Sequence, residues 1–156
     1  MNKGKERVLL LGTYTPKIDD KGRLSLPSKF RSSFSSGVII SQGIDTPCLY
    51  VSTPKEFANI QEKLRTATNE DGSKISALQI SQALRLLTAG ASEDTLDKQG
   101  RINIPPFLRS FADLKDDIIV IGVGSRVEIW NQEKWAEYNK QALSGLQKTA
   151  QEVLLF

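Results

Sequence analysis

One sequence pattern occurs twice in this chain, first as Ile18-Asp-Asp-Lys-Gly-Arg-Leu-Ser-Leu-Pro-Ser-Lys-Phe-Arg31 and again as Leu96-Asp-Lys-Gln-Gly-Arg-Ile-Asn-Ile-Pro-Pro-Phe-Leu-Arg109. The two stretches align without a gap at an offset of 78 residues, from 18 to 96. Five positions are identical (19/97, 22/100, 23/101, 27/105 and 31/109), and four more are apolar in both copies (18/96, 24/102, 26/104 and 30/108). The chain is therefore predicted to be a duplication of one structural unit.

Each copy is expected to fold as the same small β-rich unit. A strand, at 8–14 in the first copy and near 89–95 in the second, leads into the Asp-x-x-Gly-Arg turn, and alternating apolar residues then predict a half-buried strand. The proline that follows favours the first turn of a short helix. Two further strands and a closing helix complete each unit, with strands at 38–41 and 49–51 and at 118–121 and 127–129, and helices from 54 and 132. Gly122-Val-Gly124 is interpreted as the turn between the last two strands.

Neither half is large enough to bury a sufficient core alone. The halves are therefore expected to pair their strands around a pseudo-twofold axis, which places the two Asp-x-x-Gly-Arg turns side by side. The predicted division of the chain is a first repeat at 9–57, connecting helices at 58–86, a second repeat at 87–131 and a C-terminal amphipathic helix at 132–156.

Two helices outside the repeated core carry apolar stripes at helical spacing. The first is expected to start at Ser73, with a stripe at positions 77, 80, 84 and 87, and the second, from Gln132, has its stripe at positions 135, 138, 142, 146, 150 and 153. Such stripes indicate core or subunit packing more often than a cofactor site.

The basic residues gather in the repeated stretches, although the net charge is only +3. Turn geometry explains the repeated aspartate and glycine, but it does not require arginine at the turn exit. An aspartate four residues before an arginine can orient the guanidinium through a bidentate pair and hold its outer face for a phosphate or a base edge. Asp19 and Asp97 are therefore predicted to orient Arg23 and Arg101 in this way. The predicted DNA-contacting residues are Lys17, Lys21, Arg23, Arg31, Lys98, Arg101 and Arg109.

The composition argues against catalysis. The chain has no histidine and a single cysteine, Cys48, so it lacks Ser-His and Cys-His pairs and a thiolate cluster. No phosphate-binding loop or complete dinucleotide fingerprint is present. We expect no enzyme activity, catalytic residue, cofactor, metal or small-molecule substrate. The apolar run Val8–Leu11 is too short for a secretory signal or a membrane span, so a cytoplasmic protein that does not enter the membrane is expected.

Residues 12–31, Leu-Thr-Ala-Gly-Ala-Ser (87–92), the second stretch at 96–109 and Val-Glu-Ile-Trp (127–130) resemble the MraZ family. The resemblance covers roughly residues 9 to 140 and leaves out the first eight residues and the C-terminal tail. It implies an α+β fold of two pseudo-symmetric swapped-hairpin halves, akin to the AbrB family, that form a shared β-barrel core with flanking helices. The family's surface motif, Asp-x-x-x-Arg, is present at Asp19–Arg23 and at Asp97–Arg101.

The resemblance also implies a function. Members of the family assemble into ring-shaped homo-oligomers, bind repeated double-stranded DNA sequences upstream of the division and cell-wall gene cluster, and regulate transcription at the nucleoid. The alternative is a swapped-hairpin protein-interaction module, antitoxin-like or a scaffold, whose C-terminal helix binds a partner protein. Salt dependence separates the two, because phosphate contacts release counterions and packing contacts do not.

Overall fold

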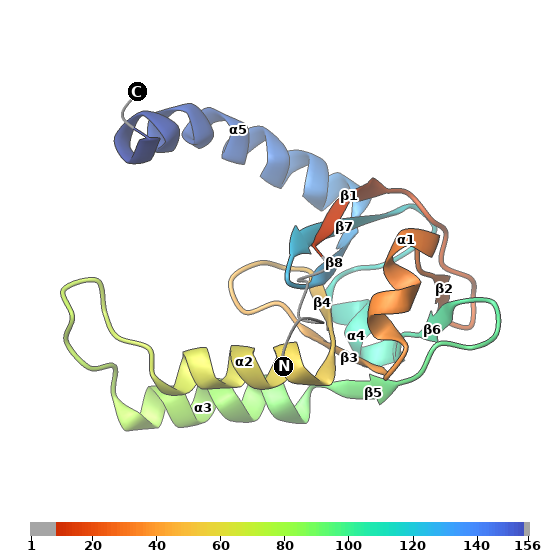
Figure 1. Ribbon diagram of the computed structural model, residues 1–156, viewed down its shortest axis with the longest axis horizontal. Coiled ribbons are helices and arrows are strands. Elements are labelled where there is room, and N and C mark those ends of the chain that lie inside the picture. Colours follow the sequence, from red (N-terminus) through yellow and green to blue (C-terminus); the bar gives the residue numbers. More distant parts are fainter. Residues whose placement is uncertain (1–8, 155–156) are drawn as a thin grey trace, which may run out of the picture.

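The computed structural model describes residues 9–154 of the 156-residue chain, and within them the protein is an α+β structure (Figure 1). The strands are β1 (Leu10–Tyr14), β2 (Arg23–Ser25), β3 (Val38–Gln42), β4 (Leu49–Ser52), β5 (Ser92–Asp94), β6 (Arg101–Asn103), β7 (Ile118–Gly124) and β8 (Val127–Asn131). The helices are α1 (Ser28–Arg31), which continues into a 3-10 turn (Ser32–Phe34), α2 (Pro54–Arg65), α3 (Ala77–Ala89), α4 (Pro106–Phe111) and α5 (Gln132–Leu154).

The strands form two antiparallel sheets in which the halves exchange strands. The six-stranded sheet has the order β1-β7-β8-β4-β3-β5, and the second sheet is the pair β2-β6. The first repeat's β1 pairs with β7 of the second repeat, while β5 of the second repeat pairs with β3 of the first. Each half therefore completes the edge of the sheet that the other half provides.

A closed barrel is not confirmed. Among the described residues the six-stranded sheet is open, with β1 and β5 as its edges. The pair β2-β6 stays a separate sheet, and between β1 and β2 only the isolated bridge Ile18↔Leu24 forms a short hairpin contact. The two sheets therefore enclose a shared core without a continuous ring of backbone hydrogen bonds.

The register shows a local twofold relation between the repeats. Leu24 pairs with Ile102 and Tyr50 pairs with Glu128, so in both sheets a residue faces its own equivalent at the offset of 78. Between β3 and β7 the offset is 80, from Val38 to Ile118, because the loop before β7 is longer, and the shorter hairpin loop after β7 restores 78. The pseudo-twofold axis passes between both pairs.

Side-chain alternation along the strands builds a core on each face of the large sheet. The face toward β2-β6 buries the larger cluster, which includes Leu24, Leu26, Phe30, Phe34, Ile102, Ile104 and Leu108. The opposite face packs Tyr50, Phe57, Leu87 and Trp130 beneath α2, α3 and the start of α5. The residues adjoining both turns are thus anchored in one core that both repeats supply.

Three local predictions were wrong or inexact. The helix expected from Ser73 begins at Ala77 with Ser76 as its N-cap, because the residues before it close a small hairpin through the bridge Thr68↔Lys74. Gly122–Gly124 lies inside β7 and is not the turn. The strand needs glycine at residue 122 because a side chain there would collide with the main chain of the neighbouring strand β1. The strand expected at 89–95 is the shorter β5, and of the strand expected at 8–14 residue 8 lies outside the described residues.

Two helical arms extend from one side of the sheet (Figure 1). Helices α2 and α3 lie against each other as a pair, whereas α5 contacts the sheet through Trp135 and Tyr138, whose rings pack against Trp130. Beyond Tyr138 the large apolar residues Leu143, Leu146 and Val153 of α5 are exposed, at 59%, 60% and 71%. No helix of residues 9–154 is both long and apolar enough to cross a membrane.

Candidate nucleic-acid interface

The first Asp-x-x-Gly-Arg turn, residues 19–23, is organised by a single carboxylate. Asp19 Oδ1 accepts hydrogen bonds from the backbone N–H groups of Lys21 and Arg23 at 3.0 and 2.8 Å, and Asp19 Oδ2 accepts one from Arg23 Nε at 2.7 Å. Gly22, with φ of 85°, closes the turn by donating its N–H to the Asp19 carbonyl at 3.0 Å. The aspartate therefore fixes the backbone and the arginine side chain together.

The second turn, residues 97–101, repeats this geometry. Asp97 Oδ1 accepts from the N–H groups of Gln99 and Arg101, both at 2.9 Å, and Asp97 Oδ2 accepts from Arg101 Nε at 2.7 Å. In both turns the hydrogen bond from the arginine's backbone N–H is the largest cause that lowers the pKa of the aspartate below its usual value, and the guanidinium adds to it. Both carboxylates are therefore charged at neutral pH.

The hydrogen bond to Nε leaves one edge of each guanidinium available. Within residues 9–154 the Nη1 and Nη2 atoms of Arg23 and Arg101 have no hydrogen-bond acceptor, and 39% and 30% of the two side chains are exposed. The contact to aspartate is through Nε alone and is not the two-bond fork that the sequence suggested. Each arginine thus retains donors suited to a phosphate or the edge of a guanine.

The ladder between β2 and β6 brings the two turns together. Arg23 lies opposite Asn103, and Ser25 lies opposite Arg101, while Leu24 and Ile102 between them point into the core. Because side chains alternate along a strand, both arginines lie on the outer face of the ladder as diagonal neighbours. Ser25 and Asn103 share this face and were missed by the sequence analysis, because only the pairing of strands 78 residues apart places them there.

The other predicted residues fall into two groups. Lys17, Lys21 and Lys98 are exposed, two of them on the turns and Lys17 just before the first. Arg31 and Arg109 are only partly exposed, and each donates from Nε to a carbonyl of its own repeat, Leu26 O or Ile104 O, at 3.0 Å. The structure thus brings the lysines to the turns and directs Nε of the other two arginines toward the backbone.

No metal-binding cluster accompanies these turns in the described part of the chain. Residues 9–154 contain no group of three or more histidine, cysteine, aspartate or glutamate side chains placed to hold a metal ion. The one cysteine is buried, and burial raises the pKa of its thiol, so Cys48 stays protonated at neutral pH.

The family comparison follows the duplication. The model of the MraZ protein family, described as antitoxin-like, matches residues 9–78 and again residues 87–156. This chain belongs to the MraZ family. The two matches together reach the end of α5, so the C-terminal tail that the sequence resemblance left out falls within the MraZ match.

Curated MraZ relatives cover almost the whole chain. The protein named "Transcriptional regulator MraZ" from Leifsonia xyli subsp. xyli is 41% identical over 146 residues, which are 94% of this chain and 97% of the relative. The proteins of the same name from Kocuria rhizophila and Clavibacter michiganensis subsp. michiganensis are 41% and 42% identical over the same shares.

Proposed function

We propose that this MraZ chain is a transcriptional regulator that binds double-stranded DNA through its two Asp-x-x-Gly-Arg turns. The observation that carries the proposal is the outer face of β2-β6, where Asp19 and Asp97 hold two arginines whose Nη atoms lack an acceptor among the described residues. Arginine forks of this kind suit phosphate oxygens and the O6/N7 edge of guanine. The relatives named as transcriptional regulators support the same function.

Within this interface the residues have different roles. We assign Arg23 and Arg101 to base or phosphate contacts, and the exposed Lys17, Lys21 and Lys98 to phosphate contacts that set the register on the duplex. The exchanged edge strands β1 and β5 favour a swapped-hairpin arrangement of two AbrB-like halves. This function needs neither a cofactor nor a catalytic residue, and it places the protein at the nucleoid in the cytoplasm.

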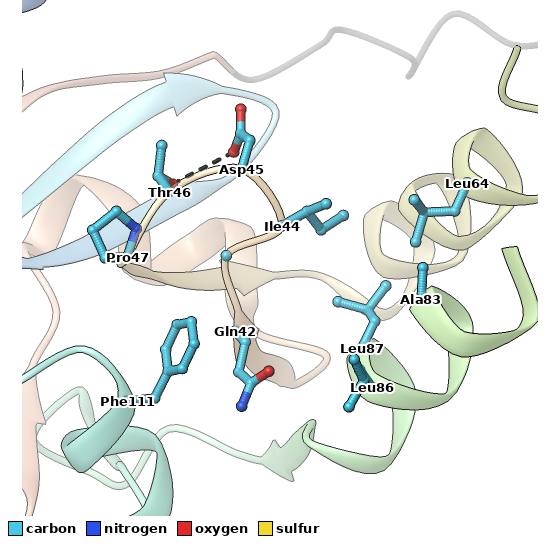
Figure 2. Close-up of a pocket in the computed structure, with 11 residues that line it drawn as sticks. Gln42, Ile44, Asp45, Thr46, Pro47, Leu64, Ala83, Leu86, Leu87 and Phe111 are labelled. Carbon is cyan, nitrogen blue, oxygen red and sulfur yellow. Dashed lines mark hydrogen bonds between the residues drawn. The ribbon is translucent and has the colours of Figure 1, made fainter. Parts of the chain in front are cut away.

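We further propose that copies of the chain assemble head to tail into a ring. An apolar pocket of about 450 Å³ lies between the β3–β4 loop, α2 and α3, and Figure 2 shows Ile44, Leu64, Leu86 and Leu87 around it. The occupant that we assign to it is α5 of a neighbouring copy, whose Leu143 and Leu146 are exposed. A contact between two different surfaces of the same chain is not self-complementary, so it closes into a ring when the rotation allows.

A ring presents the turns of successive subunits in the same orientation. The operator is therefore expected to contain direct repeats about 10 bp apart, so that each repeat faces the same side of the duplex. By the family resemblance these repeats lie upstream of the division and cell-wall gene cluster. Affinity should rise steeply with repeat number, because later contacts become intramolecular.

The test is fluorescence anisotropy with duplex DNA from the chain's own upstream region. Arg23→Ala and Arg101→Ala are each expected to weaken binding by about 1–3 kcal/mol if they contact a base, or to lower the salt slope by about one if they contact a phosphate. Arg65→Ala is the matched control, because Arg65 is an exposed arginine that pairs with Glu62 on α2, outside the turns. Wild-type affinity in the Arg23→Ala/Arg101→Ala double variant would contradict the proposal and favour the protein-interaction module.

A further inference from the structure

Arg31 and Arg109, which the sequence grouped with the DNA contacts, lie against the turn of the opposite repeat. The side chain of Arg31, on α1, crosses Gly100 so closely that an added Cβ at Gly100 would lie 2.6 Å from both Cδ and Cζ of Arg31. The relation is reciprocal, because a Cβ at Gly22 would lie 2.9 Å from Nε and 3.0 Å from Cζ of Arg109. With the two arginines in these positions, glycine leaves room for each side chain, and at Gly22 an added Cβ would also lie 2.6 Å from the Ile104 carbonyl oxygen.

The same places are tied by backbone hydrogen bonds between the repeats. Leu26 donates its N–H to the Gly100 carbonyl at 3.0 Å, and Ile104 donates its N–H to the Gly22 carbonyl at 2.8 Å. The Leu26 carbonyl in turn accepts from Arg31 Nε, and the Ile104 carbonyl accepts from Arg109 Nε, each at 3.0 Å. Leu26 and Ile104 thus have the same two roles in their repeats. The N–H of each residue binds the turn of the opposite repeat, and its carbonyl binds the arginine of its own repeat that lies against that turn.

We infer that Arg31 and Arg109 are positioning residues, each of which holds the DNA-contacting turn of the other repeat in place. The inference rests on the proposed function in taking the turns as the DNA contacts. A planar guanidinium fixed at Nε can lie flat on a glycine, whereas the ammonium group of lysine offers the same charge without the plane or the Nε–H donor. Arg31 therefore acts on Asp97–Arg101, and Arg109 acts on Asp19–Arg23.

Arg31→Lys separates positioning from direct contact, because it keeps the charge and removes the planar group. Amide hydrogen exchange of the free protein is expected to speed up severalfold at Gln99, Gly100 and Arg101 and to stay unchanged at the equivalent amides of the first turn. DNA affinity should fall several-fold with the salt slope preserved. Lys29→Ala, an exposed change on the same helix, is the control and should leave exchange in both turns unaltered.

Gly100→Ala tests the same contact from the other side. Its matched control is Gly72→Ala, because Gly72 has a similar φ of 85°, against 75° at Gly100, but no atom within 4 Å of an added Cβ. Gly100→Ala should lower Tm clearly more than Gly72→Ala, and its additional cost should shrink in the Arg31→Ala background. Both variants are compared by thermal unfolding, so the comparison holds even if Gly100→Ala is strongly destabilised.

The two proposals fail in different measurements. Unchanged exchange in the second turn of Arg31→Lys, or equal losses of Tm in Gly100→Ala and Gly72→Ala, would overturn the positioning role even if the protein binds DNA. Faster exchange in Arg31→Lys together with wild-type DNA affinity in Arg23→Ala/Arg101→Ala would support the contact between the repeats and overturn the proposed DNA-binding function of the turns.

Discussion

The two turns of this protein are nearly identical, whereas its two helical arms differ in the number and length of their helices. The bond from arginine Nε to the aspartate measures 2.7 Å in both turns. The first repeat continues into the packed pair α2 and α3, of 12 and 13 residues, and the second continues into the single 23-residue helix α5. The repeats have thus kept the same geometry where they meet and differ where they do not.

The contacts explain this difference. Each turn contacts an arginine of the opposite repeat and is hydrogen-bonded to the backbone of that repeat. A substitution in one copy therefore alters contacts made by the other copy. α5 begins as the counterpart of α2 but continues as one long helix, and beyond Tyr138 its Leu143, Leu146 and Val153 side chains are exposed. Exposed residues such as these on α5 can change in one repeat without altering the shared core, and they are available for contacts between subunits.

The largest expected effect is on assembly, because a charged side chain in an apolar contact loses its hydration without gaining a partner. Leu143→Glu/Leu146→Glu and, separately, Leu86→Glu are each expected to convert the proposed ring oligomer to monomers, as measured by size-exclusion chromatography with light scattering. Mixing the two variants should give a one-to-one dimer, because each variant keeps one intact surface. Gln147→Glu on α5 is the control for added charge.

The arm contact would be wrong if the mixture stayed monomeric or if the leucine variants kept the wild-type mass. Arg23→Ala sharpens the contrast between the two regions, since a turn variant should lose DNA affinity while it retains the mass of the oligomer.

A smaller effect is expected on the free energy of unfolding, and it should distinguish the shared core from the arms. Leu24 is fully buried on the pseudo-twofold axis, whereas Leu78 on α3 is 66% exposed and lies outside the pocket assigned to α5. Leu24→Ala should cost about 2–5 kcal/mol, because it removes contacts to both repeats and leaves a cavity. Leu78→Ala should change stability by less than about 0.5 kcal/mol in urea unfolding at a fixed protein concentration. Equal losses in the free energy of unfolding for the two variants would mean that the arms contribute as much to stability as the shared core.

The smallest expected effect is on the pH dependence of the free energy of unfolding, which can be measured separately for the two turns. The pKa values of Asp19 and Asp97 are lowered in the folded protein, mainly by the backbone N–H of Arg23 and Arg101, so each carboxylate stabilises the fold above its usual pKa of 3.8. That contribution should be lost as the pH falls from 3.8 through the folded pKa. Asp19→Asn and Asp97→Asn should therefore be less stable than wild type at pH 6, and the difference should shrink below pH 3.8.

The two turn variants should follow the same pH profile in urea unfolding if the turns are equivalent. Asp20→Asn is the control, because Asp20 is adjacent in sequence but takes no part in the hydrogen bonds of the first turn. Profiles that differ between Asp19→Asn and Asp97→Asn would show that the repeats are less equivalent than their distances indicate.

What the sequence determined by itself is local or repeated. Asp19 and Arg23 are four residues apart within one tight turn, so residue type and spacing alone predicted their contact, and the offset of 78 predicted that the second turn would match. The strands of both repeats were also located to within a few residues, because their apolar alternation reflects which face is buried.

The exchange of edge strands between the repeats depends on contacts between parts of the chain that are distant in sequence. Arg31 and Gly100 are far apart in the chain, and no spacing rule links them. Whether β2-β6 joins the larger sheet, and which way a half-buried arginine turns, depends on the packing of both repeats around one axis. A repeated pattern reports that two units are alike, but the exchange of strands and the reciprocal arginine–glycine contacts exist only when both units share one core.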